Sequence, residues 1–595
     1  FGLIGAAVAT LVAKLWSMQV MSGEEYTQRA ESNRITEYTT VAPRGRIFDR
    51  NGVELVGNRS SFVVLANAEV QNNPAVINRL STVLGIPRET IKQSAASQSG
   101  GAQADRVLAI DIDSRAVAYI TEHHEAFPGI SIEGRTVRTY PNGKLASHVL
   151  GYTGTISEAE LKKQSAGVSY ESGDIVGKDG AEQAFEAYLK GDRGVKRVEI
   201  NASGEVVNSV DSIDPAQGND VRLTLDVNVQ KVAEEALQQA FVDAHNAKYD
   251  NAAAGAIVCM NAKTGEVIAM ASAPDYDPTE FIGGISSDTW SELTGDKSGY
   301  PLSNRCIAGL YPAASTFKGF TGLAGLQYGY ASEQSPQKCW NTSGHGQIGF
   351  HMGIVESCDV VFYEIAKRFY QETADSDAVL QKYLKSWGFG QKTGIEISGE
   401  AEGRVPTPDW KKAYNKDAPE SQAWLPGDLS NLIIGQGDLL VTPLQVCCGY
   451  AGLATGRVPK PVLLSSVMAS DGETVVVDGA SFQGSTIHPD FEEKNLEIMR
   501  SGFRDVVAEG SVKNVFAGMG VNISGKTGTG EVAGHDNYGW FVGYGPSEDP
   551  QYVCACCIEE GGSGATCAAP AVRSVLAAAL GQDTSHVAGT ATEER

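Results

Sequence analysis

The stretch YPAASTFK, residues Tyr311–Lys318, is the strongest guide to the fold of this chain. Pro312 suits the first turn of a helix. Ser315 and Lys318 are three residues apart, so on a helix they share one face. A serine hydroxyl is a poor nucleophile until a base takes its proton, and a lysine amine can be that base where burial disfavours its charged form. Because an S-x-x-K pair also occurs by chance, its meaning depends on the surrounding sequence.

A second hydroxyl motif, Ser357-Cys358-Asp359, lies downstream and is followed by the apolar run VVFY. If Ser357 lies near Ser315 and Lys318, its hydroxyl can relay a proton to a leaving amine. The plainer alternative is that Ser357 caps a helix.

A third motif is ISGKTGTG, residues Ile523–Gly530, ahead of a strand-like run at Tyr538–Tyr544. Its lysine provides a positive charge for a substrate carboxylate, its threonine hydroxyls provide hydrogen bonds, and its central glycine lets a ligand approach the backbone. The residues concerned are Lys526, Thr527, Gly528 and Thr529. The alternative is an ordinary exposed turn.

The order S-x-x-K, S-x-[ND], K-T-G is the signature of penicillin-binding proteins and class A β-lactamases. Further stretches extend the likeness, and over nearly its whole length the chain resembles a class B penicillin-binding protein of the elongation type. These stretches are RGRIFDRNG at Arg44–Gly52, TGEVIAMAS at Thr264–Ser272, NLIIGQG at Asn431–Gly437 and VTPLQ at Val441–Gln445. Class A β-lactamases have neither a pedestal nor an anchor.

The resemblance implies a multidomain α+β fold. It has an N-terminal membrane anchor, an elongated pedestal or dimerisation domain, and a C-terminal transpeptidase domain in which helices pack an antiparallel sheet, as in serine β-lactamases. We place these parts at residues 1–22, 23–220 and 221–581. The polar residues 582–595 follow, and their composition predicts disorder.

Local patterns support the boundary near residue 220. A turn-rich segment at Asp214–Asp220 precedes a predicted strand, Val221–Leu225. Asp226 can then cap a helix that runs from Val227 to about Ala244 along one apolar stripe. A hairpin follows, with strands at Ala254–Asn261 and Glu266–Ser272.

The N-terminal residues Phe1–Ala13 form an apolar run that is shorter than the ~20 residues needed to span a bilayer. Lys14 and Trp16 follow it, and both residue types suit a membrane interface. We predict that residues 1–22 are the outer part of a truncated transmembrane anchor. The alternatives are a buried core helix and the remnant of a signal peptide.

Composition limits the classes of partner. The 595 residues suggest two to four domains, and 42% hydrophobic with 20% charged residues is typical of a folded protein. The formal net charge of −24 disfavours nucleic acid as a partner, because phosphate binding requires clustered lysine and arginine.

The resemblance also implies a reaction. Lys318 would take the proton of Ser315, which attacks the penultimate D-Ala carbonyl of a peptidoglycan stem peptide. Backbone N–H groups of Ser315 and Thr529 would form the oxyanion hole. Ser357 would protonate the departing D-Ala, and an amine of a second strand would then attack the acyl-enzyme. Lys526, Thr527 and Thr529 would hold the terminal carboxylate.

Partners, location and cofactors follow from the same resemblance. They are stem peptides ending in D-Ala-D-Ala, β-lactam antibiotics that acylate the serine, and a membrane glycosyltransferase of the SEDS family. The protein would be a single-pass membrane protein with an extracytoplasmic catalytic domain. The chemistry would require no cofactor.

Two features favour the elongation type over the division type. One is Asp359, where most of the superfamily has Asn, and the other is His345-Gly346 ahead of the second motif. One departure is Ala313-Ala314, where relatives usually have Pro-Gly, and we expect a slightly altered entry into the helix.

The alternatives to an elongation-type transpeptidase are a division- or sporulation-type transpeptidase, an enzyme with water as acceptor (a carboxypeptidase or β-lactamase), and a non-catalytic penicillin-binding sensor or scaffold.

A structural zinc site is a further implication, because some elongation-type relatives carry one in this segment. His345 and Cys358 match its histidine and cysteine, and Cys339 stands where a carboxylate ligand is common. Thiolates are good zinc ligands. The fourth ligand is open between Glu333, His351 and water, and the alternatives to zinc are a Cys339–Cys358 disulfide and free thiols.

Overall fold

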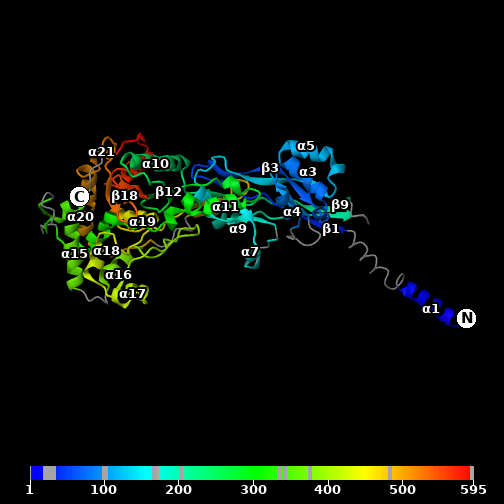
Figure 1. Cartoon of the computed structure of the whole chain (residues 1–595), viewed down its shortest axis with the longest axis horizontal. Helices are drawn as coiled ribbons and strands as arrows, with labels where there is room; N and C mark the ends of the chain where they lie inside the picture. The colour runs from blue at the N-terminus through cyan, green and yellow to red at the C-terminus, as the bar shows by residue number, and fades with distance from the viewer. Residues whose placement is uncertain are drawn as a thin grey trace.

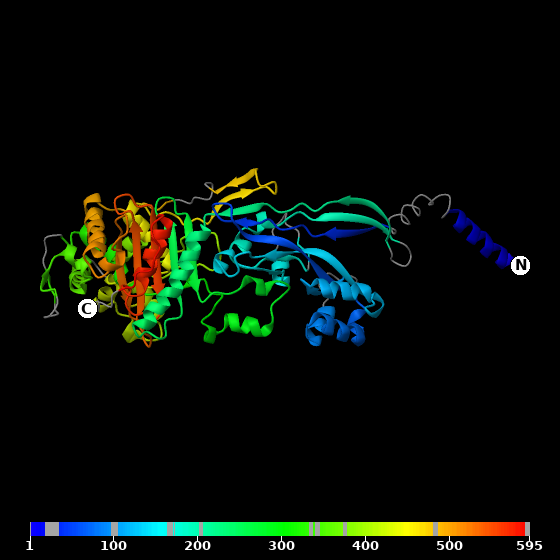
Figure 2. The same ribbon diagram turned by 90° about the horizontal axis from the view of Figure 1, so that it is seen from above.

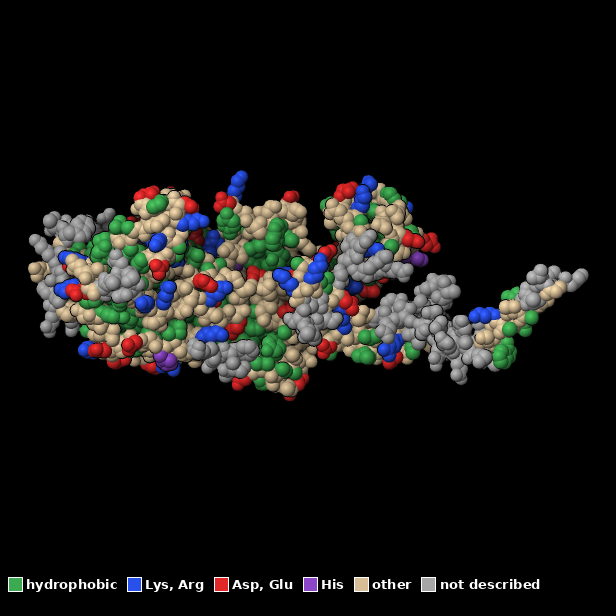
Figure 3. All heavy atoms as spheres, turned by 90° about the horizontal axis from the view of Figure 1, so that it is seen from below, with side chains coloured by type: hydrophobic (Ala, Val, Ile, Leu, Met, Phe, Trp, Pro, Cys, Tyr) green, Lys and Arg blue, Asp and Glu red, His purple; other side chains and the backbone are tan. Residues whose placement is uncertain are grey.

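The computed structural model describes residues 2–17, 35–96, 105–163, 170–171, 173–200, 206–332, 337–339, 345–372, 378–479 and 486–589. The molecule is elongated, with helix α1 (Gly2–Trp16) at one tip and a broad domain of helices around a sheet at the opposite end (Figure 1). A slender region of long strands joins the two (Figure 2). Basic and acidic side chains are interspersed over the face in Figure 3.

Helix α1 contains residues 2–13 of the apolar N-terminal run and has Lys14 in its last turn. Among the described residues, no helix combines the length and apolarity that crossing a bilayer requires. The predicted anchor is therefore not shown. Residues 18–22 of that prediction lie outside the described residues.

The pedestal is built on long antiparallel strands. Strand β3 (Glu54–Ala66) pairs with β2 (Ile47–Phe48), β4 (Arg106–Ile110) and β5 (Ile130–Thr139). A separate sheet has the order β1 (Ile35–Thr40), β8 (Gly194–Ile200), β9 (Val206–Ile213). Helices α3 (Pro74–Leu84), α4 (Arg88–Ala96) and α5 (Ser114–Glu122) enclose a second, smaller core at one end of β3 and β4. The remaining short elements are α6 (Ser147–Leu150), β6 (Thr153–Thr155), α7 (Glu158–Lys162), β7 (Ile175–Gly177), α8 (Gly180–Ala184) and α9 (Glu186–Leu189).

The pedestal sheet continues into the catalytic domain. Strand β10 (Asp220–Leu223) lies parallel to β2, with Val221 opposite Ile47, and also pairs with β15 (Leu464–Met468). Strand β16 (Val475–Asp478) forms the edge beyond β15. Hydrogen-bonded strands therefore cross the boundary that the sequence predicts near residue 220.

Charged residues of the RGRIFDRNG stretch hold this junction together. Glu182 is fully buried; its carboxylate accepts from Arg138 Nε at 2.6 Å and from Arg44 at 2.8 Å. The guanidinium of Arg46 donates to both carboxylate oxygens of the buried Asp220. Burial alone would raise the pKa of Glu182, but the two arginines outweigh burial and hold the pKa below its ordinary value. The stretch thus ties the first pedestal strands to β10.

The catalytic domain contains a five-stranded antiparallel sheet of order β12-β11-β19-β18-β17. Helices α10 and α22 pack on the sheet and on each other, and α19 packs on strands β11, β19 and β18. The strands are β11 (Gly255–Asn261), β12 (Val267–Ala273), β17 (Ser524–Gly530), β18 (Tyr538–Gly545) and β19 (Tyr552–Ile558). The longer helices are α10 (Val227–Asn246), α11 (Ser287–Thr294), α13 (Lys318–Gln327), α15 (Asp359–Glu372), α16 (Val379–Ser386), α18 (Pro426–Ile433), α19 (Pro443–Thr455), α20 (Glu493–Ala508) and α22 (Ala568–Ala579). The shorter elements are α12 (Arg305–Ala308), β13 (Gln337–Lys338), β14 (Gln347–Ile348), α14 (Phe350–Val355), α17 (Pro408–Tyr414) and α21 (Lys513–Phe516).

Several local predictions are confirmed. Asp226 caps α10 by accepting from the backbone N–H groups of Asn228 and Val229. The predicted hairpin corresponds to β11 and β12, each within one residue of the expected bounds.

Residues 582–589, part of the segment for which the composition predicts disorder, contact α22 and α10 in the structure. Arg573 donates to the carbonyl of Ser585 at 2.7 Å, and His586 pairs with Asp243 at 3.3 Å. A polar composition alone did not reveal these two contacts with charged side chains of the folded domain. Residues 590–595 lie outside the described residues.

We predict that Glu182→Gln destabilises the protein by about 3–5 kcal/mol, because it leaves the buried Arg138 without its carboxylate and removes one of the two carboxylates that pair with Arg44. Since the native pKa of Glu182 is lowered, its contribution is present above the unfolded pKa of about 4.3 and is lost as the pH falls below that value. Chemical unfolding at pH 7 and at low pH measures both effects.

The matched control is Glu158→Gln. Glu158 pairs with Lys162 at 3.7 Å, with 91% and 77% of the two side chains exposed, and such pairs contribute about 1 kcal/mol or less. Equal losses of stability in the two variants would contradict a supporting role for Glu182.

Candidate active site

Ser315 lies in a tight 3-10 turn, Ala314–Phe317, that leads directly into α13. The prediction of one regular helix across Ser315 and Lys318 is therefore only approximate. Ala314 adopts φ +51°, a backbone conformation that favours glycine. Alanine at this position therefore brings local strain where relatives have glycine, a physical consequence of the Ala313-Ala314 departure.

Distant segments fix the nucleophile turn. The Ala314 N–H donates to the carbonyl of Gly435 at 2.8 Å, and Tyr450 Oη of α19 donates to the carbonyl of Thr316 at 2.6 Å. A Cβ at Gly435 would lie 2.1 Å from the carbonyl oxygen of Ala314, so only glycine fits there. Ser315 is half-buried while its neighbours are buried, and its hydroxyl has no hydrogen-bond partner among the described residues. The turn thus leaves the hydroxyl of Ser315 accessible to a ligand.

Lys318 is fully buried and contacts the second motif. Its Nζ donates to the carbonyl of Ser357 at 2.6 Å and to Asp359 Oδ1 at 2.6 Å, and it lies 3.3 Å from Ser357 Oγ. A carboxylate beside Lys318 favours the charged form of the amine, so from the sequence we expect Asp359 to pair mainly with Lys526 or to contact substrate amide groups. The structure instead pairs Asp359 with Lys318, so the expected pairing with Lys526 is wrong. Asp359 begins α15 directly beside Lys318, and a buried ammonium requires a compensating charge.

Ser357 connects the two lysines. Its Oγ lies 2.9 Å from Lys526 Nζ and 3.3 Å from Lys318 Nζ. Ser357 adopts φ +55°, an uncommon conformation for a residue with a side chain. Such a conformation persists where surrounding contacts hold it, which is common at functional sites.

Strand β17 carries the third motif along the edge of the sheet. Lys526 and Thr527 are buried and Thr529 is half-buried. A Cβ at Gly528 would lie 3.1 Å from the Thr316 side chain, so glycine here allows β17 to pack closely on the nucleophile turn. This packing adds to the predicted role of Gly528 in ligand approach. Among the described strands, β17 pairs only with β18, so its second edge faces the nucleophile turn.

Two supporting residues were not predicted. Gln436 Nε2 donates to the carbonyl of Thr529 at 3.2 Å, and Tyr450 holds Thr316 as described. Gln436 lies within NLIIGQG, a stretch that the sequence singled out without assigning it a contact. Nothing in the local pattern around Tyr450 distinguishes it from a core residue of α19.

The structure brings Cys339, His345 and Cys358 together. One potential ligand atom from each lies within 4.8 Å of the other two. His345 Nδ1 is buried with no hydrogen-bond partner among the described residues, and His345 Nε2 lies 3.9 Å from Glu356. Burial raises the pKa of the Cys358 thiol, and the neighbouring Cys339 raises it further. Two sulfurs and an unsatisfied imidazole nitrogen form a donor set that suits zinc.

The sequence also left open a Cys339–Cys358 disulfide and the identity of the fourth zinc ligand. None of the ten cysteines is in a disulfide. His351 Nε2 lies 2.8 Å from Asp505 of α20, and His351 is not among the three residues whose ligand atoms lie together, so the fourth ligand stays a prediction. Glu333 lies outside the described residues.

Comparisons with known proteins agree with this geometry. The family described as Penicillin binding protein transpeptidase domain matches residues 255–577, and the Penicillin-binding Protein dimerisation domain matches residues 39–223. Peptidoglycan D,D-transpeptidase MrdA of Acinetobacter baumannii is 29% identical over 95% of this chain and 85% of its own length. MrdA of Escherichia coli is 28% identical over 93% and 89%.

Two solved structures are similar along most of the chain. One is in a complex between penicillin-binding protein PBP2 and MreC from Helicobacter pylori, with TM-score 0.76, 27% identity and coverage of 92% of this chain and 99% of that one. The other belongs to a peptidoglycan synthase complex that coordinates polymerization and crosslinking, with TM-score 0.71, 29% identity and 98% coverage of both chains. A dimerisation domain followed by a transpeptidase domain, in which three motifs meet at Ser357, identifies the chain as a member of the class B penicillin-binding proteins of the PBP2/MrdA kind.

Proposed function

We propose that the protein is an elongation-type peptidoglycan D,D-transpeptidase that works through an acyl-enzyme at Ser315. The observation that carries the proposal is the convergence on Ser357 Oγ, which lies within 3.3 Å of Lys318 Nζ and 2.9 Å of Lys526 Nζ. A hydroxyl between two amines can pass a proton between the nucleophile side and the substrate side of the site.

The first half-reaction begins at Ser315. Lys318 takes its proton as Oγ attacks the penultimate D-Ala carbonyl of a stem peptide, and Ser357 protonates the departing D-Ala. In the resting site Asp359 Oδ1 lies 2.6 Å from Lys318 Nζ. An amine of a second strand then attacks the acyl-enzyme and completes the cross-link. β-Lactam antibiotics acylate the same serine.

Strand β17 binds the donor peptide in this proposal. An edge strand offers backbone N–H and C=O groups to an extended peptide. Lys526, Thr527 and Thr529 hold the terminal carboxylate, while the N–H groups of Ser315 and Thr529 stabilise the oxyanion.

The central test is covalent labelling with a fluorescent penicillin followed by peptide mapping. We expect the label on Ser315, and we expect Ser315→Ala to abolish labelling with an unchanged melting temperature, because the half-exposed hydroxyl is the only group removed. Ser357→Ala is the comparison, since it should slow labelling and leave the attachment site at Ser315. A label on a different serine would refute the assignment.

A second prediction concerns the general base. Lys318→Arg should lower the acylation rate by about 10²-fold or more, because a guanidinium keeps its proton in proteins. Stopped-flow acylation measures the rate, and Lys367→Arg on the exposed side of α15 is the control for the same substitution. A rate within twofold of the unmodified enzyme would exclude Lys318 as the base.

The location and partners form the next part of the proposal. A single-pass membrane protein with an extracytoplasmic catalytic domain is supported by α1, which lies at the tip farthest from the catalytic domain (Figure 1). A SEDS-family membrane glycosyltransferase, contacting residues 1 to about 220, is supported by the similarity to a chain of a complex that coordinates polymerization and crosslinking.

We also propose that Cys339, His345 and Cys358 hold a structural zinc ion, with a fourth ligand outside this set. The chemistry of the transpeptidation requires no cofactor. A bound zinc would supply a rigid cross-link at Cys358, between Ser357 and Asp359, and so hold both side chains in place. The unsatisfied Nδ1 of His345 supports the proposal.

Zinc binding predicts about one equivalent of metal per chain by elemental analysis. Cys358→Ala should lose both the metal and thermal stability, whereas Cys567→Ala, which removes a buried thiol directly before α22, should keep the metal. A metal-free protein whose mass shows Cys339 and Cys358 oxidised would establish the disulfide instead.

A further inference from the structure

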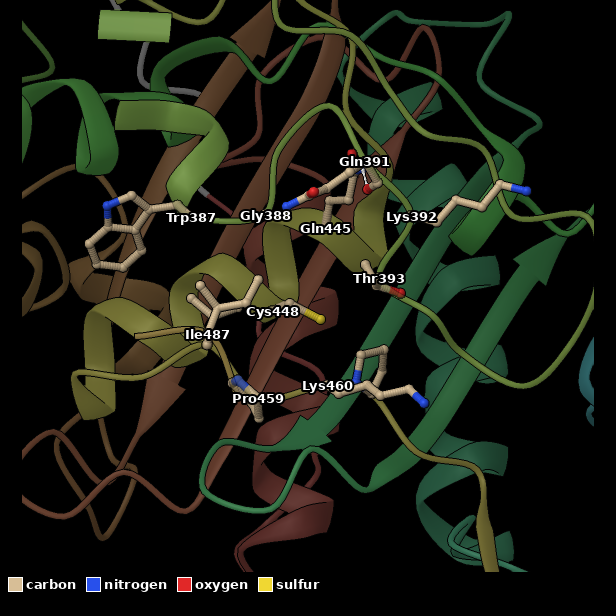
Figure 4. A pocket seen from close by; sticks show the side chains of 12 residues that line it. Trp387, Gly388, Gln391, Lys392, Thr393, Gln445, Cys448, Pro459, Lys460 and Ile487 are labelled. Carbon is tan, nitrogen blue, oxygen red and sulfur yellow. Dashed lines mark hydrogen bonds between the residues drawn. The ribbon is translucent and has the colours of Figure 1, made fainter. Parts of the chain in front are cut away.

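A cavity of about 230 Å³ lies outside the active site, between the end of α16, the loop at residues 391–393, α19 and the segment at residues 458–461 (Figure 4). None of the residues proposed for catalysis lines it. Its walls come from Trp387, Gly388, Gln391, Lys392, Thr393, Gln445, Cys448, Val458, Pro459, Lys460, Pro461 and Ile487.

One part of the lining is apolar. Trp387, Cys448 and Val458 are buried, with 1%, 3% and 4% exposure, and two prolines and Ile487 extend this surface. Trp387 is held rigidly, since its ring lies 5.6 Å from that of Phe320 on α13 and a Cβ at Gly452 would approach it to 3.0 Å. Of the apolar lining residues, Ile487 is half-buried and offers accessible surface to a ligand, while the rest are buried.

The polar side chains of Gln445 and Thr393 in the wall are already engaged. Gln445 Nε2 donates to the carbonyls of Gln391 at 2.7 Å and Glu402 at 2.8 Å, and its Oε1 accepts from Thr442 N. Thr393 donates to Glu400, a buried carboxylate that also accepts from Gly394 N and does not itself line the cavity. Uncharged hydrogen-bonding groups thus contribute little to ligand selection.

The lining charges are both positive. Lys392 and Lys460 have no acidic partner within 4.0 Å among the described residues, although the chain contains 72 acidic residues against 48 basic ones. Figure 4 shows their side chains extending to the same side of the pocket, with Trp387 on the other side. Two ammonium groups beside an apolar wall match a ligand that has a negative charge at one end and an apolar body.

We propose that this cavity is a second binding site, separate from the acylation site, for a small carboxylate with an apolar body. Lys392 or Lys460 binds the carboxylate, while Ile487 contacts the apolar part. Because the walls belong to none of the three motifs, the proposal is independent of the reaction at Ser315.

The test uses two probes of equal shape, 4-phenylbutyrate and its neutral amide, 4-phenylbutyramide, titrated calorimetrically into the full chain. We expect saturable binding of the acid with a Kd on the order of 1 mM, given the small size of the ligand. The amide should bind about tenfold more weakly, because it lacks the charge that the lysines recognise. Equal affinities for the two probes would overturn the proposal.

Variants locate the site. Lys392→Gln combined with Lys460→Gln should weaken the acid about tenfold and leave the amide unchanged. The control is Lys412→Gln combined with Lys513→Gln, which removes the same charge from exposed lysines that do not line the cavity. Ile487→Trp, which fills the apolar part, should weaken both probes.

Separation from the active site is measured with the acyl-enzyme. After complete acylation by penicillin, and likewise in Ser315→Ala, the affinity for 4-phenylbutyrate should stay within twofold of that of the free enzyme. Loss of binding on acylation would place the probe in the active site and refute the second site, whereas failure of penicillin to acylate Ser315 would affect the proposed function alone.

Discussion

The buried ammonium of Lys318 is the contact around which the site is organised. Lys318 is the first residue of α13, and its amine contacts the start of α15 through the carbonyl of Ser357 and the carboxylate of Asp359. Ser357 Oγ in turn contacts Lys526 of β17. Three segments are therefore joined at this point. A buried charge without partners is costly. Any arrangement that separated these segments would leave that cost uncompensated. The same requirement that stabilises the fold therefore brings the candidate nucleophile, base and carboxylate-binding strand together.

Two glycines allow neighbouring segments to pack closely against the nucleophile turn. A Cβ at Gly435 would collide with the backbone of the nucleophile turn, and a Cβ at Gly528 would make a tight contact of 3.1 Å with the side chain of Thr316. Behind the turn, the ring of Phe320 packs between Trp387, Phe389 and Tyr450, and Tyr450 also fixes the carbonyl of Thr316. The turn is thus clamped from both sides, which suits chemistry that depends on holding a nucleophile in position. The same aromatic packing forms one wall of the second cavity.

Paired strands and buried ion pairs connect the catalytic domain to the pedestal. The parallel pairing of β10 with β2, supported by Arg46 with Asp220 and by Glu182 with its two arginines, makes the junction part of a sheet. Residues 175 positions apart in the chain, Asn51 and Asp226, are hydrogen-bonded across it. A junction of paired strands and buried charges fixes the orientation of the pedestal relative to the catalytic domain more firmly than a flexible linker does.

The sequence alone determined the chemistry and the local elements. The motifs around Ser315, Ser357 and Lys526, the capped helix α10 and the hairpin β11–β12 follow from short-range spacing, turn chemistry and apolar periodicity, which are local properties. Tertiary structure decided the rest: the pairing of Asp359 with Lys318, the pairing of His351 with Asp505, the contacts of residues 582–589, and the cavity beside Trp387. Each of these features depends on which distant segments come into contact. Local sequence patterns do not indicate such contacts. The meeting is set by packing and by the need of buried charges for partners, both of which exist only once the chain has folded.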